Sequence, residues 1–279
     1  MSGVCTLEQA AARRRAVVSE RFPSAAHRPP HGTSRTAITF FCLVLLCGLS
    51  LSAAEEQADT DTPSRTIYKD FVDFKLVPDE LKAEVKETLE KPTFFLSKVK
   101  FEFQTKPAIY SFLLDNIPIS ASLARALRVE SYSVVEEAPQ RYYATDGAGL
   151  MGNVWLLSKE ANGGYCYGRG TYDGSIVGRV SGSVFVIATW EETESGGVRN
   201  NLYIYIRVHS AALRAAAKAL KPLLNAVANR KLKTFLESVE CLAVTLHSDP
   251  NKAYWALVNM GGVPWAQVEV FKKAYHVPR

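Results

Sequence analysis

Hydrophobic and polar residues follow two different periods along this chain. From residue 93 to residue 208 an alternation with a period of two predominates, as in "KVKFEF" and "NLYIYIRV", which is typical of half-buried strands. From Ser210 to about His247 apolar residues recur at steps of three, four and seven, which predicts one long amphipathic helix. Pro222 lies inside this segment and is expected to bend the helix. The pattern therefore predicts a sheet followed by a long helix that covers it.

Two short helices and seven strands are expected before the long helix. After the first strand, "KPAIYSFLLDN" and "IPISASLARAL" each carry a proline near the first turn of a helical segment. The six later strands are separated by turn residues, and they are "VESYSVVEE", "RYYAT", "LMGNVWLLSK", "GYCYGRGTYD", "GRVSGSVFVIATWEE" and "VRNNLYIYIRV". Gly168 and Gly170 inside the fourth of these indicate a bent strand or a close approach of two backbones.

One motif suggests a nucleotide site and needs to be tested against its surroundings. Gly147, Gly149 and Gly152 spell G-x-G-x-x-G, the pattern of a dinucleotide-binding loop. That loop requires a helix after the third glycine, whose backbone amides meet the pyrophosphate. Here "NVWLLSKE" favours a strand and ends at another turn within ten residues. The motif is therefore interpreted as a hairpin turn.

The first 54 residues resemble a secretory leader. Residues 38–51 form a predominantly apolar run, six arginines precede it, and the small residues "SAA" follow it. A basic region, a short apolar region and a small-residue cleavage site are typical of a signal peptide. The run is short for a membrane span, but an uncleaved anchor over residues 36–53 remains the alternative. We expect an exported protein, periplasmic or extracellular.

Removal of the leader changes the charge balance. The leader holds six of the 33 basic residues and two of the 28 acidic ones, so the remainder has a net charge of only +1. Binding to a nucleic acid requires a basic face. Nucleic-acid partners are therefore not expected.

The rest of the chain divides into four parts. Residues 55–66 are acidic and polar and resemble a flexible linker. Residues 67–92 form an N-terminal extension with a helix that starts after Pro78. Residues 93–247 hold the sheet and the long helix, and residues 248–279 are expected to form one further helix and a tail.

Catalytic and metal-binding patterns are sparse. The three histidines after the leader are widely spaced and form no metal-ligand pair. No catalytic residue, metal or cofactor is predicted. Cys166 and Cys241 either form a disulfide, which an exported protein could retain, or remain two buried thiols.

The order of one strand, two short helices, six strands and a long helix resembles that of the START-like (SRPBCC, helix-grip) superfamily. The resemblance covers residues 93–247 and rests on topology rather than on a sequence motif. It implies an α+β fold in which a curved seven-stranded antiparallel sheet wraps around the long C-terminal helix. It also implies an apolar cavity between sheet and helix, as in carriers, sensors and cyclases.

The first functional hypothesis is a non-catalytic binding protein for a lipid or another apolar small molecule. Arg169 would pair with an acidic head group, unless it points to solvent. The other expected wall residues are aromatic or aliphatic, namely Tyr165, Tyr167, Tyr143, Trp190, Leu220, Leu224 and Val227. Such a protein would be a monomer that contacts membranes only transiently.

Two other hypotheses remain open. Aromatic side chains that fill the interior would indicate a structural or interaction domain, whereas polar groups converging inside it would indicate a cyclase- or dehydratase-type enzyme. A continuous cavity of roughly 300 Å³ or more would favour ligand binding.

Overall fold

The computed structural model describes residues 66–174, 178–210, 214 and 221–276. For residues 98–100 and 221–231 it describes the backbone alone. The leader, the alternative anchor segment and all but the last residue of the expected linker lie outside the described residues.

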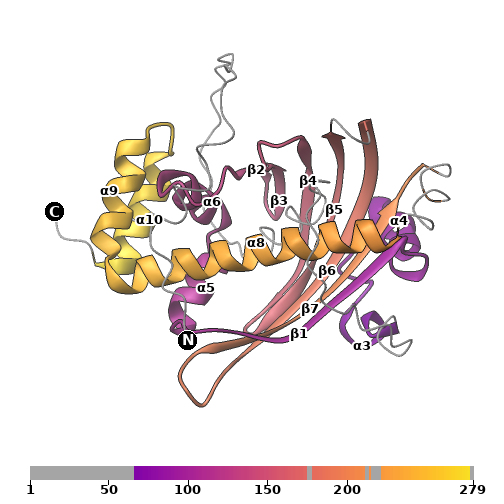
Figure 1. Cartoon of the computed structure of the whole chain (residues 1–279), viewed down its shortest axis with the longest axis horizontal. Coiled ribbons are helices and arrows are strands. Elements are labelled where there is room, and N and C mark those ends of the chain that lie inside the picture. Colours follow the sequence, from indigo (N-terminus) through magenta and orange to yellow (C-terminus); the bar gives the residue numbers. More distant parts are fainter. Residues whose placement is uncertain (1–65, 175–177, 211–213, 215–220, 277–279) are drawn as a thin grey trace.

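Seven antiparallel strands form one strongly curved sheet (Figure 1). Their spatial order is β1-β7-β6-β5-β4-β3-β2, so the first strand pairs with the last. The strands are β1 (Phe94–Phe103), β2 (Ser133–Ala138), β3 (Arg141–Thr145), β4 (Leu150–Glu160), β5 (Gly163–Gly174), β6 (Gly178–Glu192) and β7 (Val198–Val208). All six later strands occur where the alternation predicts them.

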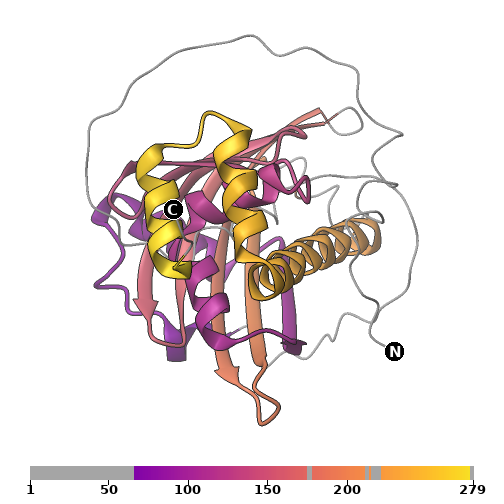
Figure 2. The same ribbon diagram turned by 90° about the vertical axis from the view of Figure 1, so that its left-hand side faces the viewer.

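Helices cover both faces of this sheet and one end of it (Figure 1). The helices before β1 are α3 (Tyr68–Phe71) and α4 (Asp79–Glu90), and those between β1 and β2 are α5 (Pro107–Asp115) and α6 (Ile117–Ala126). The last three are α8 (Lys221–Ser248), α9 (Pro250–Met260) and α10 (Trp265–Tyr275). Helices α9 and α10 lie side by side at the end of the molecule where α8 ends (Figure 2).

The alternating sides of the strands belong to two separate cores. On the concave face, residues such as Val184 and Ile204 pack with Phe235 and Leu242 of α8. On the convex face, a second cluster combines strand residues such as Phe185 with the stripe of α4, which is Leu81, Val85 and Leu89. The predicted extension helix is therefore confirmed, and its apolar stripe explains why both sides of β5, β6 and β7 are apolar.

The G-x-G-x-x-G segment is a hairpin turn between β3 and β4, as predicted. Oδ1 of the buried Asp146 accepts hydrogen bonds from the backbone N–H groups of Ala148 (2.7 Å) and Leu150 (3.0 Å). Gly147 and Gly149 have φ values of +70° and +106°, a region that favours glycine. At Gly152 a Cβ would lie 2.5 Å from the carbonyl oxygen of Arg169, so β4 and β5 approach too closely for a side chain. The close approach expected at Gly170 is thus confirmed, because Gly170 pairs with Gly152 and a Cβ on Gly170 would lie 2.4 Å from the carbonyl oxygen of Met151.

The strand order and the position of α8 define a helix-grip α+β fold, and the expected fold class is confirmed. Two details of the long helix remain predictions, its start at Ser210 and its bend at Pro222, because residues 211–213 and 215–220 lie outside the described residues. For residues 248–279 the sequence predicted one helix and a tail, whereas the structure has two helices there. Most of the expected tail forms α10, whose buried residues Val268 and Phe271 pack into the concave-face core.

Candidate functional site

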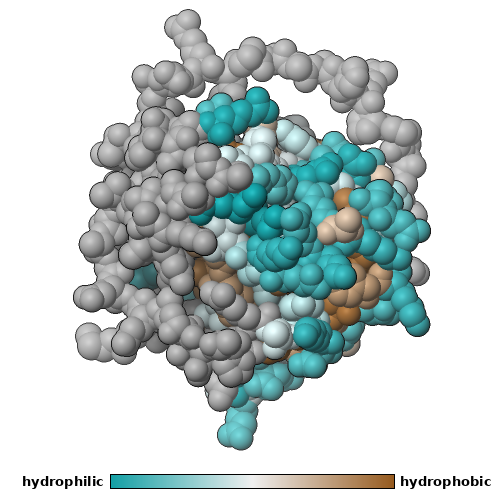
Figure 3. All heavy atoms as spheres, turned by 90° about the vertical axis from the view of Figure 1, so that its right-hand side faces the viewer, coloured by the Kyte–Doolittle hydropathy of each residue, from teal (hydrophilic) through white to brown (hydrophobic). Residues whose placement is uncertain are grey.

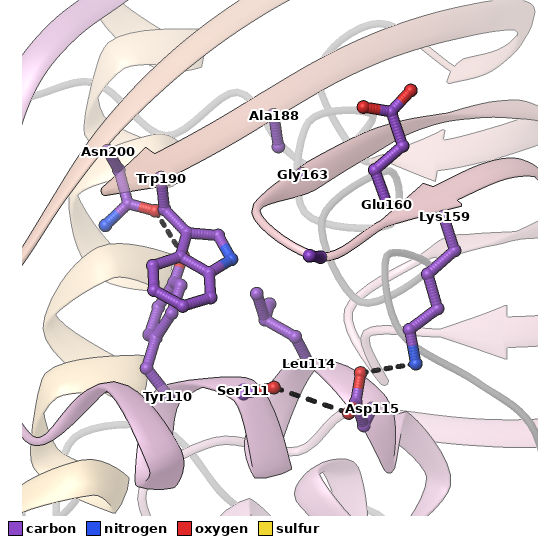
Figure 4. A pocket seen from close by; sticks show the side chains of 11 residues that line it. Tyr110, Ser111, Leu114, Asp115, Lys159, Glu160, Gly163, Ala188, Trp190 and Asn200 are labelled. Atoms are coloured by element: carbon purple, nitrogen blue, oxygen red, sulfur yellow. Dashed lines mark hydrogen bonds and ion pairs between the residues drawn. The ribbon is translucent and has the colours of Figure 1, made fainter. Parts of the chain in front are cut away.

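A small pocket opens on the concave face, between α5 and the ends of β4, β5, β6 and β7 (Figure 4). It has space for a water-sized group, about 20 Å³. Its walls are Tyr110, Ser111, Leu114, Asp115, Lys159, Glu160, Ala161, Gly163, Ala188, Trp190 and Asn200. The local sequence explains the arrangement, because Pro107 starts α5 and the 160–163 turn brings β4 back into β5.

A buried hydrogen bond joins α5 to β7 inside this pocket. The Tyr110 hydroxyl donates to Oδ1 of Asn200 over 2.5 Å, and both residues are almost fully buried. Burial raises the pKa of the Tyr110 phenol, so the group stays protonated, although the hydrogen bond with Asn200 acts in the opposite direction. Nδ2 of Asn200 makes no hydrogen bond to any described residue. The pair is thus polar within an apolar face, and the amide nitrogen of Asn200 is unsatisfied.

Aromatic rings enclose this polar pair. The Trp190 ring meets the Tyr110 ring edge-on at a centroid distance of 5.8 Å, and Phe103 lies 5.7 Å from Tyr110 on another side. Such contacts restrict the ring positions and exclude water. The phenol and the amide therefore have fixed directions, as a recognition site requires.

An ion pair forms part of the pocket rim. Nζ of Lys159 lies 2.6 Å from Oδ1 of Asp115, and both side chains are a little over one-third exposed. Ser111 also donates a long hydrogen bond of 3.4 Å to Asp115 (Figure 4). Exposed pairs of this kind contribute only about 0–1 kcal/mol, so the ion pair itself can be broken at little energetic cost.

Among the predicted ligand residues whose side chains the structure describes, only Trp190 lines this pocket. Tyr165 and Tyr167 belong to the convex-face cluster with α4, so they do not line the space between the sheet and α8. Arg169 shares that face, and its Nη1 lies 3.2 Å from Oε2 of Glu84. Tyr143 alternates with the buried Tyr142 and is 37% exposed on the convex side.

The remaining predicted wall residues lie on the long helix. Leu220 is outside the described residues, and for Leu224 and Val227 the structure describes the backbone alone. Their expected contact with a ligand stays a prediction.

Sequence reasoning missed most of the pocket. Tyr110, Asp115, Lys159 and Asn200 were not identified, because nothing in the chain links α5 to β7 across 90 residues. One signal was present for Asn200. It interrupts the otherwise apolar inward series of β7, between Val198 and Leu202.

A second polar cluster lies on the opposite face of the sheet, beneath α4. His209 Nε2 lies 3.1 Å from Oγ of the fully buried Ser183 and 3.4 Å from Oε1 of Glu84. In a serine-histidine-carboxylate triad the carboxylate orients the histidine through its other nitrogen. Here both contacts involve the same nitrogen, and Ser183 Oγ also bonds to Thr88 Oγ1 at 2.8 Å. This cluster therefore joins α4 to the sheet and is not a nucleophilic site.

The two cysteines outside the leader do not form the disulfide that was considered. Cys241 of α8 carries a buried thiol rather than a disulfide sulfur. Cys166 belongs to the concave-face core, and Cys241 is buried on α8.

The described residues hold neither a metal-binding cluster nor a membrane-spanning helix. They contain no group of three or more His, Cys, Asp or Glu side chains placed to hold a metal ion. None of the helices in the described part of the chain is long and apolar enough to cross a membrane.

Comparison with known proteins gives fold-level likeness only. No protein-family profile matches the chain, and no curated protein matches it. Among solved structures, a conserved protein from Geobacillus kaustophilus is 12% identical with a TM-score of 0.41, covering 55% of this chain and 97% of its own. The structure of Ara h 8.0201 is 11% identical, with a TM-score of 0.31. The match covers 50% of this chain and 98% of the Ara h 8.0201 chain. Protein Ms6760 from Mycobacterium smegmatis is 15% identical, with a TM-score of 0.33. The match covers 54% of this chain and 90% of the Ms6760 chain.

These likenesses carry no conclusion about function. The helix-grip description rests on the strand order and on the packing of α8 against the concave face.

Proposed function

We propose that this chain is an exported, non-catalytic binding protein of the START-like type. Its ligand is a small amphipathic molecule whose polar end enters the pocket between α5 and the concave face of the sheet. The observation that carries the proposal is the Asn200 amide, which is 1% exposed and has an unsatisfied Nδ2 donor. A buried donor without an acceptor costs roughly 1–3 kcal/mol, and a ligand carbonyl or carboxylate oxygen would remove that cost.

The surroundings of Asn200 suit such a ligand. Binding sites for small molecules are mainly apolar and contain a few orienting polar groups. Trp190 and Ala188 supply apolar surface, while Tyr110 holds the amide in one direction. A space of about 20 Å³ accepts only a water-sized group. A whole ligand therefore requires the Asp115–Lys159 rim to open.

The test combines native mass spectrometry with ligand uptake. We would purify the protein from its own export route, record its mass before and after organic extraction, and titrate it with the fluorescent fatty acid cis-parinaric acid. The proposal predicts an added mass that extraction removes, or saturable uptake of the probe. Asn200→Leu should weaken uptake about tenfold, equivalent to about 1.4 kcal/mol. Arg169→Ala, on the convex face, is the matched control and should leave uptake unchanged.

The rate of probe uptake tests whether the ligand enters past the Asp115–Lys159 ion pair. Lys159→Gln removes the ion pair with Asp115 without touching Asn200, so probe uptake should become faster while the pocket chemistry stays the same. Unchanged rates would show that the ligand enters elsewhere.

A second candidate is a structural or interaction domain with a filled interior. Two observations favour it: Phe103, Tyr110 and Trp190 pack closely against one another, and the pocket of about 20 Å³ is far smaller than the roughly 300 Å³ expected of a ligand cavity. A protein that is bare on isolation and takes up no probe would contradict the binding proposal and favour this one.

A further inference from the structure

Two of the four tryptophans lie largely exposed on the C-terminal helices. Trp255 of α9 is 56% exposed and Trp265 at the start of α10 is 60% exposed. Large apolar side chains gathered on a surface often mark a binding site. Neither side chain is a buried member of the concave-face core, although the Trp255 ring contacts Tyr254, which is.

Both tryptophans are related to the contact between Tyr254 of α9 and Lys272 of α10. The Trp255 ring contacts the Tyr254 ring edge-on at 5.3 Å, and Nζ of Lys272 lies 6.0 Å from the Tyr254 ring. Lys272 is seven residues, about two turns, after Trp265, so both lie on the same stripe of α10. We call the surface formed by Trp255, Trp265 and Lys272 the α9–α10 seam.

This seam faces away from the body of the protein. Ala253 and Leu257 of α9 and Val268 and Phe271 of α10 are buried in the concave-face core. The two helices lie side by side and form an outer layer at one end of the molecule (Figures 1 and 2). At the opposite end, beside α4, the described surface is mainly hydrophilic with a few hydrophobic patches (Figure 3).

The charges around the seam are mostly positive. Across α9 and α10 there are three lysines, Lys252, Lys272 and Lys273, against one acid, Glu269. Tryptophan prefers the interface between lipid and water, where its ring is partly buried and its N–H stays hydrated. Lysines close to a membrane surface are attracted by anionic head groups.

We propose that the α9–α10 seam docks this protein on an anionic lipid surface. Trp255 and Trp265 enter the head-group region, and Lys252, Lys272 and Lys273 lie against the lipid phosphates. The attachment is peripheral, since the seam supplies side chains from two short helices rather than a membrane span. It does not depend on the proposed ligand pocket, which lies between α5 and the sheet.

Vesicle flotation of the full protein tests the proposal directly. The vesicles are phosphatidylcholine alone, or phosphatidylcholine mixed with phosphatidylglycerol. We expect flotation with the mixed vesicles, a blue shift of tryptophan fluorescence, and release at high salt because salt screens the lysines. The double variant Trp255→Ser/Trp265→Ser should bind about tenfold more weakly. The triple lysine-to-glutamine variant at 252, 272 and 273 should lose the preference for phosphatidylglycerol.

A matched control uses exposed apolar residues at the other end of the molecule. Phe71→Ser/Leu76→Ser replaces side chains that are 40% and 51% exposed, and it should leave flotation unchanged. Circular dichroism of each variant shows whether it is folded. Conservative Trp255→Phe/Trp265→Phe should retain most binding if a seam variant with serine proves unstable.

Three outcomes would overturn the proposal. They are no flotation with either vesicle, equal flotation of the serine variant, or self-association in the absence of lipid that the serine variant abolishes. The last would assign the seam to contact between protein copies. Probe uptake measured on the same variants separates the two proposals, because seam variants should keep uptake and Asn200→Leu should keep flotation.

Discussion

The Tyr110 hydroxyl and Oδ1 of Asn200, 2.5 Å apart, form a polar pair inside the apolar concave face. The pair connects α5 with β7 and lies beside the Asp115–Lys159 rim. The pair offers polar groups in fixed directions to an incoming molecule. Its contribution to the free energy of unfolding can be measured by mutation.

A double-mutant cycle on this pair should show strong coupling. Tyr110→Phe leaves both polar atoms of the Asn200 amide unsatisfied, and Asn200→Leu leaves the Tyr110 hydroxyl unsatisfied. We expect each single change to cost about 1–3 kcal/mol of unfolding free energy. The double variant should be less destabilised than the sum, because no buried polar group is left alone. Urea denaturation measures all four proteins, and additive losses would argue against the buried hydrogen bond.

Removing apolar surface from α4 should destabilise the whole domain. Leu81 is 3% exposed and packs against the convex face of the sheet. Leu81→Ala should cost about 2–5 kcal/mol, as for other buried leucines. Leu76→Ala is the control, since that side chain is 51% exposed and should change stability by less than about 0.5 kcal/mol. Equal effects in thermal denaturation would show that α4 is not part of the folded unit.

Gly152 should tolerate no side chain. A Cβ there would lie 2.5 Å from the Arg169 carbonyl oxygen and 2.6 Å from the Gly170 Cα, both backbone atoms that cannot move alone. We expect Gly152→Ala to cost more than about 1 kcal/mol, although alanine normally improves a strand interior. Ser181→Ala, at an exposed position of β6, should be nearly neutral. A stable Gly152→Ala protein would mean that β4 and β5 are farther apart than described.

Stability should fall when His209 is protonated. Burial lowers the pKa of His209 from its ordinary 6.5, and nearby Arg207, Arg169 and Arg214 act in the same direction, while Glu84 opposes them. A lowered pKa means that the folded state binds fewer protons than the unfolded state. The stabilisation is therefore present above pH 6.5 and is lost as the pH falls from there through the folded pKa.

Urea denaturation between pH 8 and pH 5 checks this sign. His209→Gln should remove the His209 contribution and flatten that part of the profile, while both proteins keep any slope that arises from their carboxylates. If the variant had the same pH dependence as the parent, His209 would not be the titrating group.

The chain order of the elements was predictable because it depends on local periodicity. Period-two alternation located all seven strands, and the stripe Leu81, Val85 and Leu89 located α4. The strand-forming segment after Gly152, where a nucleotide loop requires a helix, excluded the nucleotide loop. Each of these conclusions depends on residues within a few positions of one another.

Only the tertiary structure decided which side of each strand faces α8. Alternation separates a strand into two sides but does not say which is concave, and β5 carries apolar residues on both. The long-range docking of α4 assigned Tyr165, Tyr167 and Arg169 to the convex face. The same three-dimensional packing brought Tyr110 to Asn200, a contact that no local pattern encodes. The sequence thus determined the seven strands, most of the helices and their order, and packing between distant segments determined the site.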